Sequence, residues 1–225
     1  MEGVLLIDKP PDWTSHDVVA KIRKTLSQKL GKKIKVGHAG TLDPMATGLL
    51  IILVGGYTKR AGEFLKLDKT YECELTLGKI STTGDADGKI SRISEEIPRQ
   101  SAIKKVVAEF IGTIKQTPPA YSAIKIKGQA AYKLARAGRK LKMEPRVIKI
   151  HDLKIKSYQY PKLSFTAEVS SGTYIRSLAA DIGARLGTGA YLSALRRTRI
   201  ATFRLEDALT LDKINAASIN QHLQS

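Results

Sequence analysis

Residues 37–54 read GHAGTLDPMATGLLIILV, a glycine-rich turn that leads directly into an apolar run. The run at 49–54 has few polar atoms and is preceded and followed by glycines, a pattern that predicts a buried strand. Within the turn, Pro44 disfavours the helical region for the residue before it, so the turn presents the Asp43 carboxylate. Loops held by rigid strands often carry functional side chains. The pattern alone also fits an ordinary Asp-Pro turn with a hydrogen-bonded loop histidine.

Apolar residues recur with two different periods along the rest of the chain. Three further segments have the short apolar run or the alternation of a strand: 4–7, 71–77 and 163–169. Three others have the spacing of a helix: 18–26, 103–110 and 175–186. Residues 14–17 are a capping-box-like start for the first of these helices, and Gly187 closes the last. We therefore predict an α/β chain of the α+β type.

The composition indicates a folded protein with a large excess of positive charge. Of the 225 residues, 42% are hydrophobic and 26% are charged, which is ordinary for a globular chain. The 38 Lys and Arg residues exceed the 21 Asp and Glu residues, so the formal net charge is +17. A charge of this size attracts polyanions, and nucleic acid is the leading partner. A generically basic protein is the alternative.

Several classes of protein receive no support from the sequence. The single cysteine, Cys73, suits a reducing compartment. The longest apolar run, 48–56, is too short to span a bilayer, and the amino-terminal run lacks the features of a signal peptide, so we expect a cytoplasmic protein. The sequence contains no Walker loop, dinucleotide fingerprint, metal-spaced His/Cys cluster or Gly-x-Ser-x-Gly elbow. We expect neither a cofactor nor a metal.

Seven segments together resemble one enzyme family. The motif GHAGTLDPMATGLL at 37–50 is similar to the signature of the TruB-type tRNA pseudouridine synthases, in which the aspartate is the catalytic residue. Six more segments match in the family's order: VLLIDKP at 4–10, KTY at 69–71, TTGDADG at 82–88, QTPPAYSAIKIKGQAAYKLAR at 116–136, SGTYIRSLAADIGARLG at 171–187 and LRRTRIATF at 195–203. The resemblance thus covers residues 4–205.

The resemblance implies a reaction and its catalytic residues. The family detaches uracil from ribose C1′, turns the base and rejoins it through C5, without a cofactor. It implies that Asp43 is the nucleophile acting on a uridine of the tRNA T-loop, position 55. Arg176 matches the arginine that pairs with this aspartate, and Tyr71 matches a tyrosine that stacks on the target base and is a candidate for the final proton transfer. By pattern alone, Arg176 also fits a helix surface and Tyr71 a plain core residue.

The resemblance also implies residues that hold the substrate. Tyr174 and Leu195 match residues of the base-binding pocket, although a buried tyrosine and a core leucine fit the sequence as well. His38 matches a histidine that contacts the substrate backbone, and a loop histidine bonded to local backbone is the alternative. These three residues are expected to bind substrate, not to react.

Two other matched motifs are expected to be structural. Lys9 and Pro10 match a motif that mainly supports the wall of the active site, but by pattern we favour a lysine that extends its ammonium group toward water. Asp85 and Asp87 match a turn motif, and carboxylates that bond the backbone of a tight turn explain them.

The segment at 112–146 resembles the family's thumb loop, which closes over the RNA. Between residues 115 and 149 there are ten basic residues and one acidic residue. Flipping a uridine out of a folded loop costs about a few kcal/mol, which base stacking and phosphate contacts can offset. The residues expected to contact RNA are Lys125, Lys127, Tyr132, Arg136, Arg196 and Arg197. A solvated charged face is the alternative.

The family's fold is a mixed, mostly antiparallel sheet flanked by helices, with a long catalytic cleft. We expect a catalytic domain at 1–210, with the thumb-like insertion at 112–146, and a carboxy-terminal tail at 211–225. Many relatives carry a further RNA-binding domain of the PUA type. We expect this chain to lack it, either naturally or by truncation, and to act on tRNA as a monomer without an obligate protein partner.

Two other functions remain compatible with the sequence. The charge alone would suit a non-catalytic RNA-binding protein or a tRNA-folding chaperone, which would bind RNA without forming product. A related pseudouridine synthase that is guided by RNA or acts on another RNA is the second alternative. Turnover of a tRNA T-stem-loop by the purified protein separates these possibilities.

Overall fold

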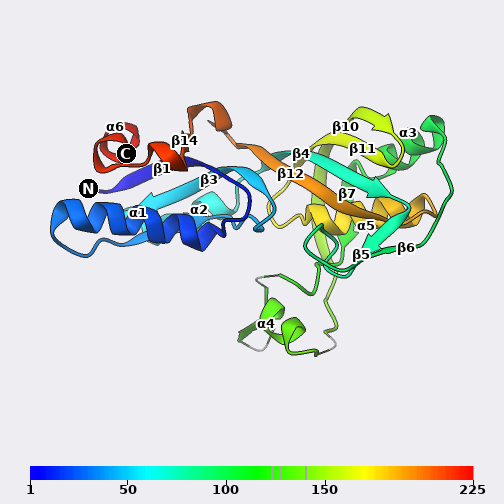
Figure 1. The fold of residues 1–225 in the computed structure, drawn as a ribbon, viewed down its shortest axis with the longest axis horizontal. Coiled ribbons are helices and arrows are strands. Elements are labelled where there is room, and N and C mark those ends of the chain that lie inside the picture. Colours follow the sequence, from blue (N-terminus) through cyan, green and yellow to red (C-terminus); the bar gives the residue numbers. More distant parts are fainter. Residues whose placement is uncertain (123, 127, 140, 225) are drawn as a thin grey trace. The chain divides into compact units, whose positions relative to one another are not determined.

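The computed structural model describes residues 1–122, 124–126, 128–139 and 141–224 (Figure 1). The chain divides into two units, the first made of Met1–Glu72 and the part from Leu195 onward, the second made of Cys73–Ala194. It leaves the first unit within strand β4 (Lys69–Leu77) and returns to it within strand β12 (Ala190–Ile200). The first unit therefore contains the start of β4 and the end of β12, and the second unit contains the end of β4 and the start of β12.

The first unit contains a mixed sheet with the strand order β14-β1-β3-β12. The strands are β1 (Gly3–Lys9), β3 (Thr47–Val54), β14 (Leu209–Thr210) and the end of β12, while β2 (Val36–Ala39) pairs with β3 and β13 (Phe203–Arg204) pairs with β12. β1 is antiparallel to β3 and parallel to β14, and β12 is parallel to β3. The helices of this unit are α1 (Ser15–Leu30), α2 (Ala61–Leu65) and α6 (Ala216–His222), with short 3-10 turns at Gly55–Arg60, Leu205–Asp207 and Leu211–Lys213.

Both faces of β3 are covered, which explains why this strand is apolar at nearly every position. Its even-numbered side chains from Leu50 to Val54 pack in one cluster with side chains of α1 and with Ile219 of α6. Its odd-numbered side chains from Leu49 to Leu53 pack in a second cluster with Phe64 of α2. Figure 1 shows α1 alongside β1 and β3. The strand predicted at 49–54 is confirmed.

Helix α1 begins at the predicted signal. The Thr14 hydroxyl accepts a hydrogen bond from the Asp17 amide at 3.1 Å, and the Asp17 carboxylate accepts one from the Thr14 amide at 2.9 Å. This reciprocal pair is a capping box, and Gly31 ends the helix with a φ of 62°. The capping box fixes where the chain enters the helix, and therefore which of its side chains face the sheet.

The second unit contains a sheet with the order β12-β4-β11-β10-β7, counting the parts of β12 and β4 that lie in this unit. Its other strands are β7 (Gly112–Gln116), β10 (Arg146–Gln159) and β11 (Lys162–Val169), and β10 is antiparallel to both of its neighbours. A separate hairpin is formed by β5 (Lys79–Ser81) and β6 (Ile90–Arg92). Helix α3 (Gln100–Glu109) contacts β10 and α5 (Ile175–Arg185). The predicted strand at 163–169 and the predicted helices at 103–110 and 175–186 are confirmed.

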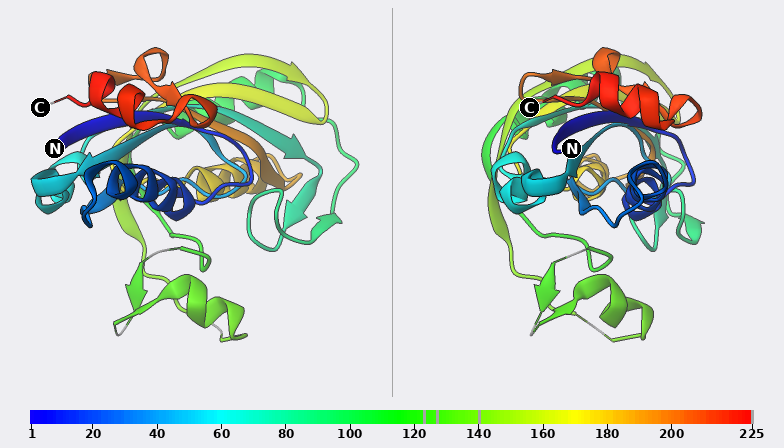
Figure 2. Two further views of the ribbon diagram at one scale, coloured as in Figure 1. Left: turned by 60° about the vertical axis from the view of Figure 1, so that its left-hand side comes forward. Right: turned by 90° about the vertical axis from the view of Figure 1, so that its left-hand side faces the viewer.

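The segment between β7 and β10 extends away from these two strands (Figures 1 and 2). It contains a short hairpin, β8 (Lys125–Ile126) with β9 (Gln129–Ala130), and the helix α4 (Ala131–Arg136). The sequence predicts an irregular insertion at 112–146. The structure shows that its first residues form β7 and that its last residue begins β10.

The predicted fold class is confirmed, because the sheets are mixed and mostly antiparallel and carry helices on their faces. The single catalytic domain at 1–210 remains a prediction. Residues 211–225 were expected to form a tail, but Ile214 and Ile219 are buried in the core of the first unit. Within the described residues, no helix is long and apolar enough to cross a membrane.

Gly48, at the start of β3, is tightly enclosed by the backbone of β12. Its φ is 100°, and an added Cβ atom would lie 2.3 Å from the carbonyl oxygen of Arg197. We expect Gly48→Ala to lower the free energy of unfolding by about 2 kcal/mol or more, since it combines an unfavourable φ with a clash against backbone. Chemical denaturation measures this change. Gly62→Ala in α2 is the control, because nothing lies within 4 Å of its added Cβ, and an unchanged stability of Gly48→Ala would contradict the enclosure.

Candidate active site

The loop that carries Asp43 joins two antiparallel strands of the first unit, β2 and β3. Gly40 and Gly48 flank it, and their φ angles of 101° and 100° lie where residues with a Cβ atom are strained. The Ala46 amide donates to the Asp43 carbonyl at 3.1 Å, which closes a turn around Pro44. The Asp43 side chain is partly exposed. The predicted turn is thus present, with its carboxylate at the end of a buried strand.

Buried polar side chains of neighbouring segments hold this loop. The Ser15 hydroxyl donates to the Leu42 carbonyl at 3.2 Å and accepts from the Leu42 amide at 2.9 Å. The Lys9 ammonium group donates to the Pro44 carbonyl at 3.1 Å, and also to the carbonyls of Pro10 at 2.9 Å and Trp13 at 2.7 Å. The backbone on both sides of Asp43 is therefore anchored through hydrogen bonds to β1 and α1.

Lys9 is completely buried, so it does not extend its ammonium group toward water as an exposed lysine would. Burial lowers its pKa to about 8, against the opposing effect of the negative charges of Asp12 and Asp43. The positive charge of Arg197 contributes to this lowering as a smaller cause than burial. The predicted supporting role of Lys9 agrees with its three carbonyl partners.

The lowered pKa of Lys9 predicts how stability depends on pH. Between about 8 and 10.5, the unfolded chain holds a proton on this lysine that the folded chain has lost. The stability linked to Lys9 is therefore complete above 10.5 and is lost as pH falls through about 8. We expect the free energy of unfolding of the wild type, minus that of Lys9→Met, to rise with pH across this window. Denaturation at a series of pH values measures the difference, and a flat difference would refute the assignment.

Tyr71 lies on β4 in the first unit and is 8% exposed. The Arg197 guanidinium carbon lies 6.0 Å from the centre of its ring, at the outer limit of a cation–π contact. Leu195 is buried on β12 in the same unit. Neither residue is an exposed surface residue, and both remain candidates for contact with the target base.

His38 lies on β2 and is partly buried. Within the described part of the chain, its buried Nδ1 atom has no hydrogen-bond partner. Burial lowers the pKa of His38, and the charges of Arg197 and His16 lower it further. In the protein without RNA, burial and these charges therefore favour the uncharged form of the ring.

Arg176 lies in the second unit, in the first turn of α5, and is 6% exposed. Its guanidinium group lies 3.2 Å from a carboxylate oxygen of Asp85 and donates to the carbonyls of Thr83 at 3.1 Å and Tyr121 at 2.7 Å. Asp85 is also buried, and it accepts hydrogen bonds from the Thr83 hydroxyl and from the Asp87 amide, the latter at 3.1 Å. The turn at 82–88 thus positions a buried arginine.

Tyr174 immediately precedes α5, and a buried glutamine of β7 fixes its backbone. The Gln116 side chain accepts from the Tyr174 amide at 2.8 Å and donates to the Tyr174 carbonyl at 3.1 Å. The Ser177 hydroxyl donates to the Thr117 carbonyl at 2.8 Å. The start of α5 is therefore tied to the strand that leads into the basic segment.

The structure groups the predicted site residues within the two units. Asp43, His38, Tyr71 and Leu195 belong to the first unit, whereas Tyr174 and Arg176 belong to the second. The sequence analysis did not predict that Asp85 pairs with Arg176. The carboxylate in the turn at 82–88 could have indicated such a pair. Pairing of Asp43 with Arg176 remains a prediction.

Residues 23–175 match the model of the TruB family pseudouridylate synthase amino-terminal domain, and residues 176–225 match that of the tRNA pseudouridylate synthase B carboxy-terminal domain. A protein of Opitutus terrae called tRNA pseudouridine synthase B is 46% identical over 96% of this chain and 88% of its own length. The chain belongs to the TruB family of pseudouridine synthases. Relatives of the same name in Thermobifida fusca and Burkholderia mallei are 41% and 42% identical, with 75% and 70% of their lengths covered.

Solved structures are similar to this chain in sequence and in fold. A chain in the crystal structure of a Cbf5-Nop10-Gar1 complex is 33% identical, with a TM-score of 0.72 over 93% of this chain. A chain in an H/ACA RNP bound to a substrate RNA containing 2'-deoxyuridine is 31% identical, with a TM-score of 0.69. The TruB-family chain spans about half the length of each of these two chains, 52% and 51%.

The residues predicted to contact RNA differ in their exposure. Lys125 and Tyr132 are exposed in the segment between β7 and β10, and Arg136 ends α4. Lys127 lies outside the described residues. Arg196 is partly exposed, and its guanidinium group lies 2.8 Å from a carboxylate oxygen of Asp8.

The prediction for Arg197 requires a correction. Arg197 is 1% exposed, and its guanidinium group donates to backbone carbonyls inside the first unit. It therefore does not present its charge to RNA, and we do not keep it among the RNA-contacting residues.

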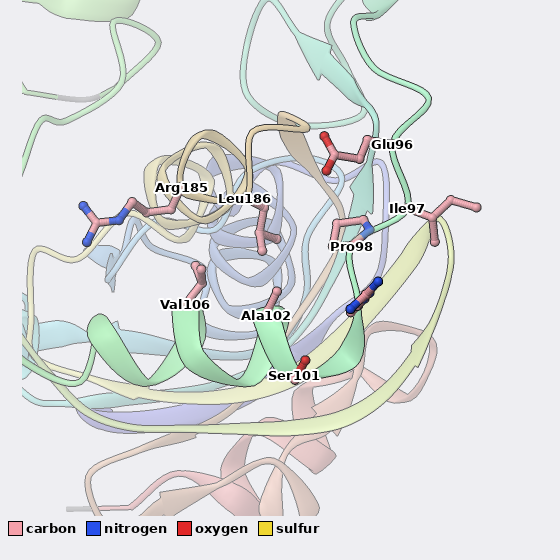
Figure 3. Close-up of a pocket in the computed structure, with 9 residues that line it drawn as sticks. Glu96, Ile97, Pro98, Ser101, Ala102, Val106, Arg185 and Leu186 are labelled. Carbon is pink, nitrogen blue, oxygen red and sulfur yellow. The ribbon is translucent and has the colours of Figure 1, made fainter.

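A pocket of about 350 Å³ in the second unit contains none of the predicted site residues. Figure 3 shows Ala102 and Val106 of α3 pointing toward Leu186, beyond the end of α5. The charged residues that line it are Glu96, Arg99 and Arg185. Arg185 lies 2.5 Å from Glu109, so part of this charge is already paired. Two of its lining residues, Arg185 and Leu186, lie at the end of the matched segment at 171–187, but neither was predicted to bind substrate or to act in catalysis.

Proposed function

We propose that this TruB-family chain converts a uridine in the T-loop of tRNA, at position 55, to pseudouridine, with Asp43 as the nucleophile. The observation that carries the proposal is the anchored loop of the first unit, which presents the Asp43 carboxylate within the motif that matches the family signature. Relatives that share 41–46% of their residues with this chain are called tRNA pseudouridine synthase B. These findings support isomerisation of uridine in tRNA.

The reaction rearranges bonds without adding or removing atoms. The bond between ribose C1′ and uracil N1 breaks, the base turns, and a bond forms between C1′ and C5. The proton on C5 is lost and N1 gains one. Asp43 acts on the ribose-base unit, and Tyr71 is our candidate for the proton transfer that completes the reaction.

The nucleophile must be ionised to act. An aspartate in water has a pKa of about 3.9, and burial raises the pKa of a carboxyl group unless a cation compensates. We assign that cation to Arg176, which Asp85, Thr83 and Tyr121 hold in a fixed position within the second unit. Lys9 adds positive charge near the loop, since its pKa responds to the charge of Asp43.

The target uridine must leave the stack of the folded T-loop before it reaches Asp43. We assign the flipped base to Tyr71, Tyr174 and Leu195, and the substrate backbone to His38. Outside this site, Lys125, Tyr132, Arg136 and Arg196 are proposed to contact RNA by stacking and by neutralising phosphates. We further propose that the protein acts in the cytoplasm as a monomer, without a cofactor or an obligate protein partner.

The hypothesis that the chain is a non-catalytic RNA-binding protein or a tRNA-folding chaperone is less favoured than the enzyme. It rests on the net charge of +17, which an enzyme acting on tRNA also requires. The match to the family extends over residues 23–225 and includes the catalytic motif.

Tritium release from a T-stem-loop labelled at C5 of its uridines tests the proposal. Because rejoining the base through C5 displaces the hydrogen there, the purified chain alone should release tritium and yield pseudouridine detectable by mass spectrometry. A stem-loop with cytidine at the target position is the control and should release none. Tight binding without release would favour the non-catalytic reading, and turnover only with an added guide RNA or on another RNA would favour the related synthases.

A further inference from the structure

We propose that Arg197 is a positioning residue that fixes the Asp43 loop relative to Tyr71. This inference rests on the proposed function and assigns a role to a residue of the same site. Among the described residues, Arg197 is the largest side chain with less than 2% exposure. Burying a guanidinium group is costly and calls for specific hydrogen-bond partners.

The hydrogen bonds of Arg197 span the two ends of the Asp43 loop. Its Nη2 atom donates to the Gly40 carbonyl at 3.0 Å, before Asp43, and its Nε atom donates to the Leu49 carbonyl at 2.7 Å, after Asp43. A single planar group therefore sets the separation between the start and the end of the loop. Lys9 and Ser15, in contrast, each hold the loop at one residue within it.

Two glycines on either side of Asp43 lie against Arg197. The backbone of Arg197 pairs with Gly48 across the parallel strands β12 and β3, where an added Cβ would lie 2.3 Å from the Arg197 carbonyl oxygen. An added Cβ on Gly40 would lie 3.5 Å from Nη1 of the same arginine. The loop thus packs against both the backbone and the side chain of Arg197.

The same guanidinium group reaches Tyr71 on β4. Its carbon lies 6.0 Å from the centre of the Tyr71 ring. Its charge also acts on a neighbouring lysine. Burial is the main cause of the lowered pKa of Lys69, and the positive charge of Arg197 is the second cause. Arg197 thus touches the loop of the proposed nucleophile and lies next to the tyrosine proposed for stacking and proton transfer.

The test is Arg197→Lys, which keeps a buried charge but replaces the planar fork by one point donor that cannot serve both carbonyls in the same way. We expect the amides of residues 41–46 to exchange hydrogen faster than in the wild type, while α1 and β3 stay protected. On the T-stem-loop, kcat should fall by about 100-fold, because a misplacement of about 1 Å has this effect, and KM should change less than about twofold. Arg60→Lys is the control, since Arg60 is exposed and pairs with Glu63.

Several results would overturn the proposal. Unchanged loop exchange or unchanged kcat would show that the loop does not depend on Arg197. A raised KM with unchanged kcat would make Arg197 a substrate-binding residue, and a variant that fails to fold would make it a residue of general stability. If the wild type shows no turnover, the proposed function fails, whereas hydrogen exchange still decides whether Arg197 fixes the loop.

Discussion

Replacing Asp43 by asparagine is expected to abolish pseudouridine formation, with a loss of at least about 10⁴-fold, the scale seen when an enzyme loses its nucleophile. Asparagine has nearly the volume of aspartate, so the loop should keep its anchors to Lys9 and Ser15. The loss would therefore report on the negative charge and the nucleophilic oxygen.

Tritium release and RNA affinity should be measured on the same Asp43→Asn preparation. We expect the dissociation constant for the T-stem-loop to stay within a few-fold of the wild-type value, since the phosphate contacts are untouched. Asp207→Asn is the control, because it removes the same charge from an exposed position of the first unit and should retain full activity. Turnover by Asp43→Asn at the wild-type rate would end the assignment of the nucleophile.

The second large effect is expected for Asp85→Asn. Asp85 and Arg176 are both almost completely buried and lie 3.2 Å apart, so removing the carboxylate charge breaks a buried ion pair of the guanidinium group. Breaking such a pair costs about 3–5 kcal/mol of stability. We also expect kcat to fall by about 100-fold, because Arg176 would lose the partner that orients it.

Chemical denaturation and turnover assays measure the two effects of Asp85→Asn. Asp87→Asn in the same turn is the matched control, since Asp87 is exposed. A surface substitution of this kind usually changes stability by less than about 0.5 kcal/mol. Equal stability of Asp85→Asn and Asp87→Asn would contradict the role of the buried pair.

The helices and strands that were predicted from the sequence are those whose start or whose apolar pattern is set by residues close together in the chain. The capping box before α1 and the apolar run of β3 were recognised because each depends on neighbours in the sequence. Strand β10 was missed, since lysines interrupt its apolar residues and its register shifts after Ile150 and again after Ile155. Each shift displaces the alternation by which a strand is recognised.

The site residues were predicted less evenly, because burial and partners depend on the whole fold. The sequence alone could not show that Asp85 meets Arg176, which follows it by 91 positions. Arg197 was misjudged as an RNA contact because it lies in a run of arginines. A signal was present, since Arg197 is two residues from buried Leu195 on one strand and so shares its face.

The most direct test of the account is an experimental structure of Asp43→Asn bound to a T-stem-loop. We expect the target uridine to lie outside the base stack, with C1′ about 3.5 Å from the side chain at position 43. The same structure should show the guanidinium group of Arg176 in contact with that side chain. A uridine still stacked in the loop, or positions 43 and 176 apart with no base between them, would contradict the account.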